Sequence, residues 1–147
     1  MEDRNVEKQV WQRVRSAAEE QPGNDLRQLH REAMELAAIY RGLLPRMTGW
    51  QREQAAKLHQ GERANAAALA GIGVLSRQGG EQLKLWQPGN EDPKKLLQRC
   101  YHRSRRCMTE YMARSADGEY GVVFDALAKR EGAHCVLIAE ILGHLKE

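Results

Sequence analysis

The fold is encoded most clearly in residues 120–145, YGVVFDALAKREGAHCVLIAEILGHL. At helical spacing, one face of this stretch is an apolar stripe interrupted by two polar residues; its members are Tyr120, Phe124, Leu127, Glu131, His134, Ile138, Ile141 and Leu145. Glu131 and His134 are three residues apart, so their side chains lie on the same face of a helix. The pattern predicts a core-facing helix with a Glu-x-x-His pair among its buried residues.

The Glu-x-x-His pair is a functional clue because a buried ionised carboxylate is costly. A cation, a metal ion or a set of hydrogen bonds has to compensate such a charge. A Glu three places before a His also arises by chance in a chain rich in Glu, so the inference depends on the position of the pair within the apolar stripe. A metal site and an internal polar network both fit this position.

The composition favours an all-α protein with one main domain. A chain of 147 residues is long enough to bury a core, and one domain is the expectation for this length. Ala, Leu, Glu, Arg and Gln are abundant, whereas the clusters of Val, Ile and Thr that favour strands are few. The net charge of +3 is small and both signs are interspersed, so the charge does not by itself indicate a nucleic-acid-binding protein.

The sequence favours a cytoplasmic protein without a membrane span. No apolar run approaches the roughly 20 residues that cross a bilayer, and the first ten residues, MEDRNVEKQV, lack the apolar core of a signal peptide. Cys100 and Cys107 are separated by about 10 Å along a helix, which is too far for a disulfide. The three cysteines are therefore expected to be small core residues in a reducing compartment.

Five helices are expected along the chain. Residues 1–22 have a modest amphipathic pattern and predict an N-terminal accessory helix that ends in a turn at Gln21-Pro22-Gly23-Asn24. Residues 23–147 predict a four-helix bundle, with helices at about 24–44, 48–75, 93–115 and 120–145. The connection at about residues 77–93 is the longest and is long enough to cross the bundle.

Polar residues also occupy inward positions on the other bundle helices. The second helix carries Glu62 and Asn65 within its apolar stripe, which repeats the spacing of Glu131 and His134. The third helix places Ser104 on its inward stripe, and on the first helix Glu32 lies at or just beside the core face. Each bundle helix therefore brings a polar group to the core or to its edge.

These features resemble the ferritin-like superfamily, in particular the rubrerythrin-like di-iron carboxylate proteins, over about residues 25–145. That family builds its site from one Glu on each of two helices and a Glu-x-x-His on each of the other two. Glu131 and His134 match one Glu-x-x-His, and Glu62 matches the Glu of the other. Asn65 stands where the family has His, and Ser104 stands where it has Glu.

The resemblance implies a ferritin-like four-helix bundle with one long crossover and a degenerate metal site. Its expected metal ligands are Glu62, Glu131, His134 and Glu32. Iron is the expected ion, with manganese or zinc as alternatives, and the implied role is in iron or oxidative-stress handling. Like many helical bundles, the protein is expected to be a homodimer.

Two other interpretations of the same residues remain open. In a metal-free bundle, Arg103 would turn inward and pair with Glu62 or Glu131, and the protein would act as a structural or protein-interaction module. Alternatively, the basic run RCYHRSRR at residues 99–106 would bind nucleic acid, which is the weakest interpretation because such helix faces usually pair with nearby acids. The remaining histidines lie off the inward stripes and are expected at the surface: His30, His59, His102 and His144.

Overall fold

The computed structural model describes residues 22–72, 86–116 and 118–145. These residues form four α-helices and no strand, which confirms the all-α prediction. The helices are α2 (Pro22–Leu43), α3 (Gly49–Gly71), α4 (Pro93–Arg114) and α5 (Gly121–His144), and a short 3-10 helix, η1 (Leu44–Arg46), follows α2. The predicted N-terminal accessory helix at residues 1–22 falls almost wholly outside the described residues.

The turn between α2 and α3 follows from its prolines and glycines. Pro45 has no N–H to donate to the helix ladder, so the chain leaves α2 at Leu43 and tightens into η1. Gly49 has a φ of +58°, a left-handed conformation that favours glycine, and it begins α3 after an extended Thr48. The chain reverses here within five residues, and α3 returns along α2.

The start of α4 is capped by a side chain. The Asp92 carboxylate accepts a hydrogen bond of 3.2 Å from the backbone N–H of Lys94, and Pro93 occupies the first helical turn, where its missing N–H has no cost. The helix then runs to Arg114 and a short turn leads into α5. This start agrees with the sequence prediction.

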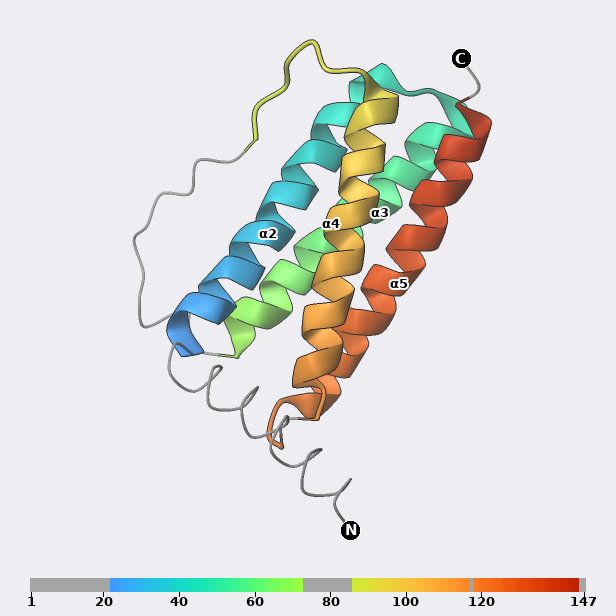
Figure 1. Ribbon diagram of the computed structural model, residues 1–147. Helices are drawn as coiled ribbons and strands as arrows, with labels where there is room; N and C mark the ends of the chain where they lie inside the picture. Colours follow the sequence, from blue (N-terminus) through green and yellow to red (C-terminus); the bar gives the residue numbers. More distant parts are fainter. Residues whose placement is uncertain (1–21, 73–85, 117, 146–147) are drawn as a thin grey trace.

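The four helices pack as two hairpins, α2 with α3 and α4 with α5 (Figure 1). The hairpins meet through contacts of α3 with α5 and of α2 with α4. The end of α3 and the beginning of α4 lie at opposite ends of the bundle. All helices that pack against each other are therefore antiparallel, and their inward stripes share one core.

Two helix boundaries differ from the sequence prediction. We expected a turn at Pro22-Gly23-Asn24, but these residues already belong to α2. Proline is well suited to the first turn of a helix, so Pro22 starts this helix instead of ending the previous one. The second bundle helix was expected to reach about residue 75, whereas α3 ends at Gly71, and residues 73–75 lie outside the described part.

None of the described helices combines the length and the apolar character required to cross a membrane.

The cysteines are buried and free, as expected for small core residues. Burial raises the pKa of the Cys100 thiol to about 12, so this group is protonated at neutral pH and is a poor nucleophile.

We predict that Leu36→Ala lowers the free energy of unfolding by about 2–5 kcal/mol, because Leu36 is fully buried and its removal leaves a cavity. The matched control is Val136→Ala on α5, where the side chain is 59% exposed and the change should be within about 0.5 kcal/mol. Urea denaturation of both variants measures the difference. Equal effects would show that α2 is not packed as described.

Candidate metal centre

A cluster of five polar side chains lies in the middle of the bundle core. Glu62 and Asn65 come from α3, Ser104 from α4, and Glu131 and His134 from α5. The first four are completely buried and His134 is 4% exposed. The sequence placed Glu62, Asn65, Glu131 and His134 on inward stripes, and all four face the core as predicted. Ser104 faces the core as well.

The carboxylate of Glu131 is held at both oxygens by neutral donors. Asn65 donates from Nδ2 to Oε1 at 2.8 Å, and Ser104 donates from Oγ to Oε2 at 2.5 Å. Arg130 in turn donates from Nη1 to Oδ1 of Asn65 at 2.7 Å, which orients the amide so that its NH₂ faces Glu131. Hydrogen bonds to the charged form compensate the burial of this carboxylate.

His134 links the two glutamates. Its Nδ1 lies 2.9 Å from Oε1 of Glu62 and 3.7 Å from Oε2 of Glu131. This contact is a hydrogen bond in which either the Nδ1–H of the imidazole or the protonated carboxyl of Glu62 is the donor. One face of the cluster therefore contains two carboxyl groups that converge on a single imidazole nitrogen.

Gly61 makes room for this imidazole. A Cβ added at Gly61 would lie 2.6 Å from Cε1 of His134 and closer still to Nε2, where no real side chain fits. Glycine within a helix costs about 1 kcal/mol relative to alanine. The close approach of α5 to α3 at this point explains why a glycine is present here despite that cost.

The pKa values of the two glutamates are shifted in opposite directions. Burial, followed by the neighbouring Glu131, raises the pKa of Glu62 well above the ordinary carboxyl value. Burial also acts to raise the pKa of Glu131, but hydrogen bonds with Glu62, His134 and Ser104 outweigh it and lower that pKa. A proton shared by the pair is therefore favoured on Glu62, and the ionised form is favoured on Glu131.

Two buried oxygen atoms, Oε2 of Glu62 and the hydroxyl oxygen of Tyr111, lack a hydrogen-bond partner among the described residues, and the hydroxyl of Tyr40, which also makes no hydrogen bond of good geometry, lies beside Ser104 and Cys100. Both tyrosines are fully buried. The charges of Glu62 and Glu131 contribute to raising the pKa of each tyrosine, after the larger effect of burial, so these hydroxyls are within electrostatic reach of the carboxyl pair. Unpaired buried oxygens are unusual and suggest a missing donor or cation.

Glu62, Glu131 and His134 form a group that could hold a metal ion. One possible ligand atom from each lies within 4.8 Å of the others. Tetrahedral ligands at the 2.0–2.2 Å bond lengths of zinc are separated by about 3.3 Å. The distances of 2.9 Å and 3.7 Å from His134 Nδ1 to the two carboxyl oxygens bracket this spacing. The residues present therefore fit one ion with small side-chain movements.

Glu32, the fourth ligand expected from the sequence, does not join this group of three. Its carboxylate accepts two hydrogen bonds from the Arg103 guanidinium, at 2.5 Å and 3.0 Å. Arg103 thus faces Glu32, and the pairing with Glu62 or Glu131 expected for a metal-free bundle is absent from the described residues. To bind a metal, Glu32 would have to exchange this partner.

Sequence reasoning missed three contributors to the cluster: Gly61, Arg130 and the orphaned tyrosine hydroxyls. A glycine in the middle of a long helical pattern was an available signal for close packing. Arg130 gave no signal, because a charged residue next to an inward Glu is usually solvated. Its reach to Asn65 depends on the relative position of α3 and α5.

The basic run at residues 99–106 is partly neutralised. Arg99 forms an ion pair with Glu91, and Arg103 pairs with Glu32. Arg105 and Arg106 are exposed on α4. Two of the four arginines of this run are therefore engaged by acids within the chain.

No family model, curated protein or solved structure matches this chain. The chemistry of the cluster is therefore inferred from its geometry.

We predict that the metal-free protein loses stability as the pH rises above 4.5, the ordinary value for Glu62, and that Glu62→Gln reduces this loss. The folded state retains a proton on Glu62 that the unfolded chain releases, so rising pH favours unfolding. Glutamine does not titrate. The pKa of Glu131 is lowered, so this group makes the protein less stable as the pH falls, and it does so only below pH 4.5.

Urea denaturation with a chelator present, at several values from about pH 5 to about pH 8, measures this difference. Glu140→Gln, which removes an exposed carboxylate from α5, is the control and should follow the wild type. Parallel curves for the wild type and Glu62→Gln would contradict the assignment of the buried proton.

We also predict that Gly61→Ala destabilises the fold or displaces His134, although alanine is the better helix former by about 1 kcal/mol. The physical reason is the overlap of the new methyl group with the imidazole. Gly143→Ala on α5 is the control, since a Cβ there meets nothing within 4 Å. Equal stabilisation of the two variants in urea would show that α3 and α5 are further apart than described.

Proposed function

We propose that this protein is a ferritin-like bundle that binds one divalent transition-metal ion through Glu62, Glu131 and His134. The observation that carries the proposal is the convergence of two carboxyl groups and one imidazole in the buried core, beside an oxygen of Glu62 that has no hydrogen-bond partner among the described residues. A metal ion binds deprotonated ligands, so it would displace the proton that is favoured on Glu62.

One ion is better supported than two. Two metal ions need about four carboxylates to balance their charge, and this core contains two. Asn65 occupies the position where the resemblance expects His, and its oxygen is already bound by Arg130. Its role is to orient Glu131, as is that of Ser104.

Two carboxylates and one histidine suit Fe(II), Mn(II) or Zn(II). A bound ion of this kind would supply Lewis acidity and, in the case of iron, one-electron chemistry. The chain itself contributes the orientation of Glu131 and a core from which water is excluded. The resemblance connects such a site with iron or oxidative-stress handling in the cytoplasm.

The helix arrangement supports the ferritin-like part of the proposal. The end of α3 and the start of α4 lie at opposite ends of the bundle (Figure 1), and residues 72–92 separate them in the sequence. Five polar residues of the resemblance, Glu62, Asn65, Ser104, Glu131 and His134, also fall where α3, α4 and α5 approach one another. Bundles with one crossover and inward carboxylates build metal sites in this way.

A metal-free structural or protein-interaction module, acting as a homodimer, is the second candidate. The direct contact of His134 with Glu62 favours it, because this contact and the donors to Glu131 satisfy most of the cluster without an ion. In that case the buried network would specify the packing of α3 against α5.

Elemental analysis of the untagged protein tests the proposal. The protein is purified without chelator after growth with added iron and manganese, and the same is done with Glu131→Gln and His134→Gln. About one ion per chain is expected in the wild type and far less in both variants, because each loses one of three ligands. His102→Gln, an exposed histidine on α4, is the control and should retain the ion.

Thermal melts of the same proteins with and without metal separate the two candidates. A metal-dependent rise in melting temperature that disappears in Glu131→Gln supports the metal site. If the wild type is purified without metal and its melting temperature does not change on addition of iron, manganese or zinc, these residues act as a polar network. About two ions per chain would contradict the single-ion proposal.

A further inference from the structure

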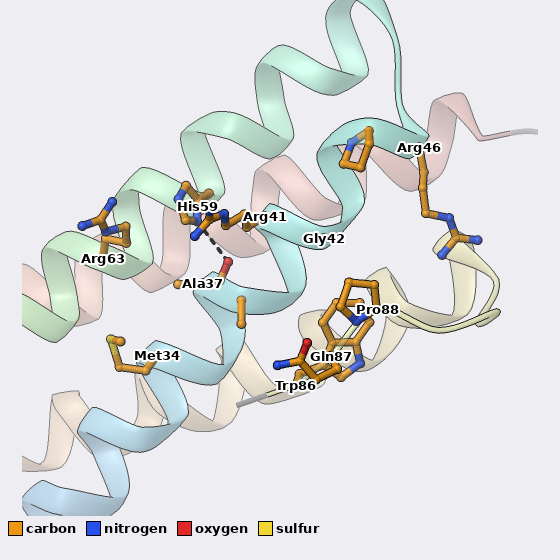
Figure 2. A pocket seen from close by; sticks show the side chains of 12 residues that line it. Met34, Ala37, Arg41, Gly42, Arg46, His59, Arg63, Trp86, Gln87 and Pro88 are labelled. Carbon is orange, nitrogen blue, oxygen red and sulfur yellow. Dashed lines mark hydrogen bonds between the residues drawn. The ribbon is translucent and has the colours of Figure 1, made fainter. Parts of the chain in front are cut away.

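A second feature of the molecule is a pocket on the outer side of α2 and α3, of about 740 Å³ (Figure 2). Residues of α2, η1, α3 and the segment 86–88 line it. Sites for small organic ligands in proteins have volumes of about 300–1,000 Å³, so this pocket is of suitable size.

The pocket has an apolar wall built around Trp86. The indole ring packs directly on Gly42, where an added Cβ would lie 2.9 Å from one ring carbon and closer to another. The Trp86 backbone N–H donates to Oε2 of Glu35 at 2.9 Å, which fixes the segment against α2. Met34, Ala38 and Pro88 extend this wall.

The rim of the pocket is cationic. Arg41, Arg46 and Arg63 all line it and all are exposed, and none has an ion-pair partner among the described residues. No acidic side chain is among the lining residues. The nearby Glu35 accepts the hydrogen bond from Trp86. The opening therefore combines three exposed guanidinium groups with an aromatic wall.

His59, expected at the surface from its position off the inward stripe, is instead partly buried and lines the same pocket. Its Nδ1 lies 3.0 Å from the carbonyl oxygen of Ala37. A carbonyl only accepts, so Nδ1 carries the ring proton and Nε2 is the atom left for a ligand. Figure 2 shows this hydrogen bond between α3 and α2.

From these observations we propose that the pocket binds a small organic carboxylate with an apolar body. The guanidinium groups match a carboxylate in charge and in planar, two-donor geometry. The body of the ligand would lie against Trp86, Met34 and Ala38. This site is separate from the metal centre, since Arg63 is exposed on the outer side of α3 while Glu62 is buried inside.

Calorimetric titration of the full-length protein with decanoate tests this proposal, with decanol as the uncharged probe. Saturable binding of decanoate is expected, and decanol should bind at least about tenfold more weakly, because it cannot pair with the arginines. In the double variant Trp11→Phe/Trp50→Phe, Trp86 is the one remaining tryptophan of three, so its fluorescence should change on binding.

Substitutions in the pocket locate the bound decanoate. Arg41→Gln/Arg63→Gln should weaken decanoate binding at least about tenfold, whereas Arg105→Gln/Arg106→Gln on the exposed face of α4 should not change it. Ala38→Phe, which fills the pocket and leaves the arginines in place, should also weaken binding. Circular dichroism verifies that each variant is folded.

Four results would overturn the proposal. Decanol could bind as tightly as decanoate, or Arg41→Gln/Arg63→Gln could bind as the wild type does, and either outcome removes the electrostatic basis. A loss of decanoate binding in Glu131→Gln or His134→Gln would place the ligand in the core instead. Absence of saturable binding would exclude this ligand class.

Discussion

The structure depends on the compensation of one buried carboxylate, that of Glu131. It is completely buried, and its charge is tolerated because Asn65 and Ser104 donate to its two oxygens and the imidazole of His134 lies beside it. Asn65, Ser104 and His134 come from three helices. Since an uncompensated carboxylate in the core costs several kcal/mol, the relative positions of α3, α4 and α5 are coupled to this one group.

This coupling explains why features that weaken single helices are present. Gly61 lowers the helix propensity of α3 but lets His134 approach its backbone. Ser104 and Asn65 are polar groups in apolar stripes, and each is satisfied only across a helix interface. Oε2 of Glu62, within this cluster, has no hydrogen-bond partner among the described residues, and the group of Glu62, Glu131 and His134 could hold a metal ion.

The two proposed sites use opposite sides of α3. Its inner face presents Glu62 and Asn65 to the core, and its outer face presents His59 and Arg63 to the pocket beside Trp86. The inner site combines anionic ligands with low exposure, which suits a metal cation. The outer site combines guanidinium groups with an aromatic wall, which suits an organic anion. Neither site requires the other.

The all-α class, the approximate extents of α3, α4 and α5, and the identity of the inward polar residues could all be predicted from the sequence. Each of these depends on periodicity and on breakers such as Pro45 and Pro93, which act through local geometry. The hydrogen-bond partners, in contrast, were established by the packing of the helices. Arg103 pairs with Glu32 and not with the core glutamates, and Arg130 reaches Asn65. These choices depend on distances between helices far apart in the chain, which no local pattern encodes.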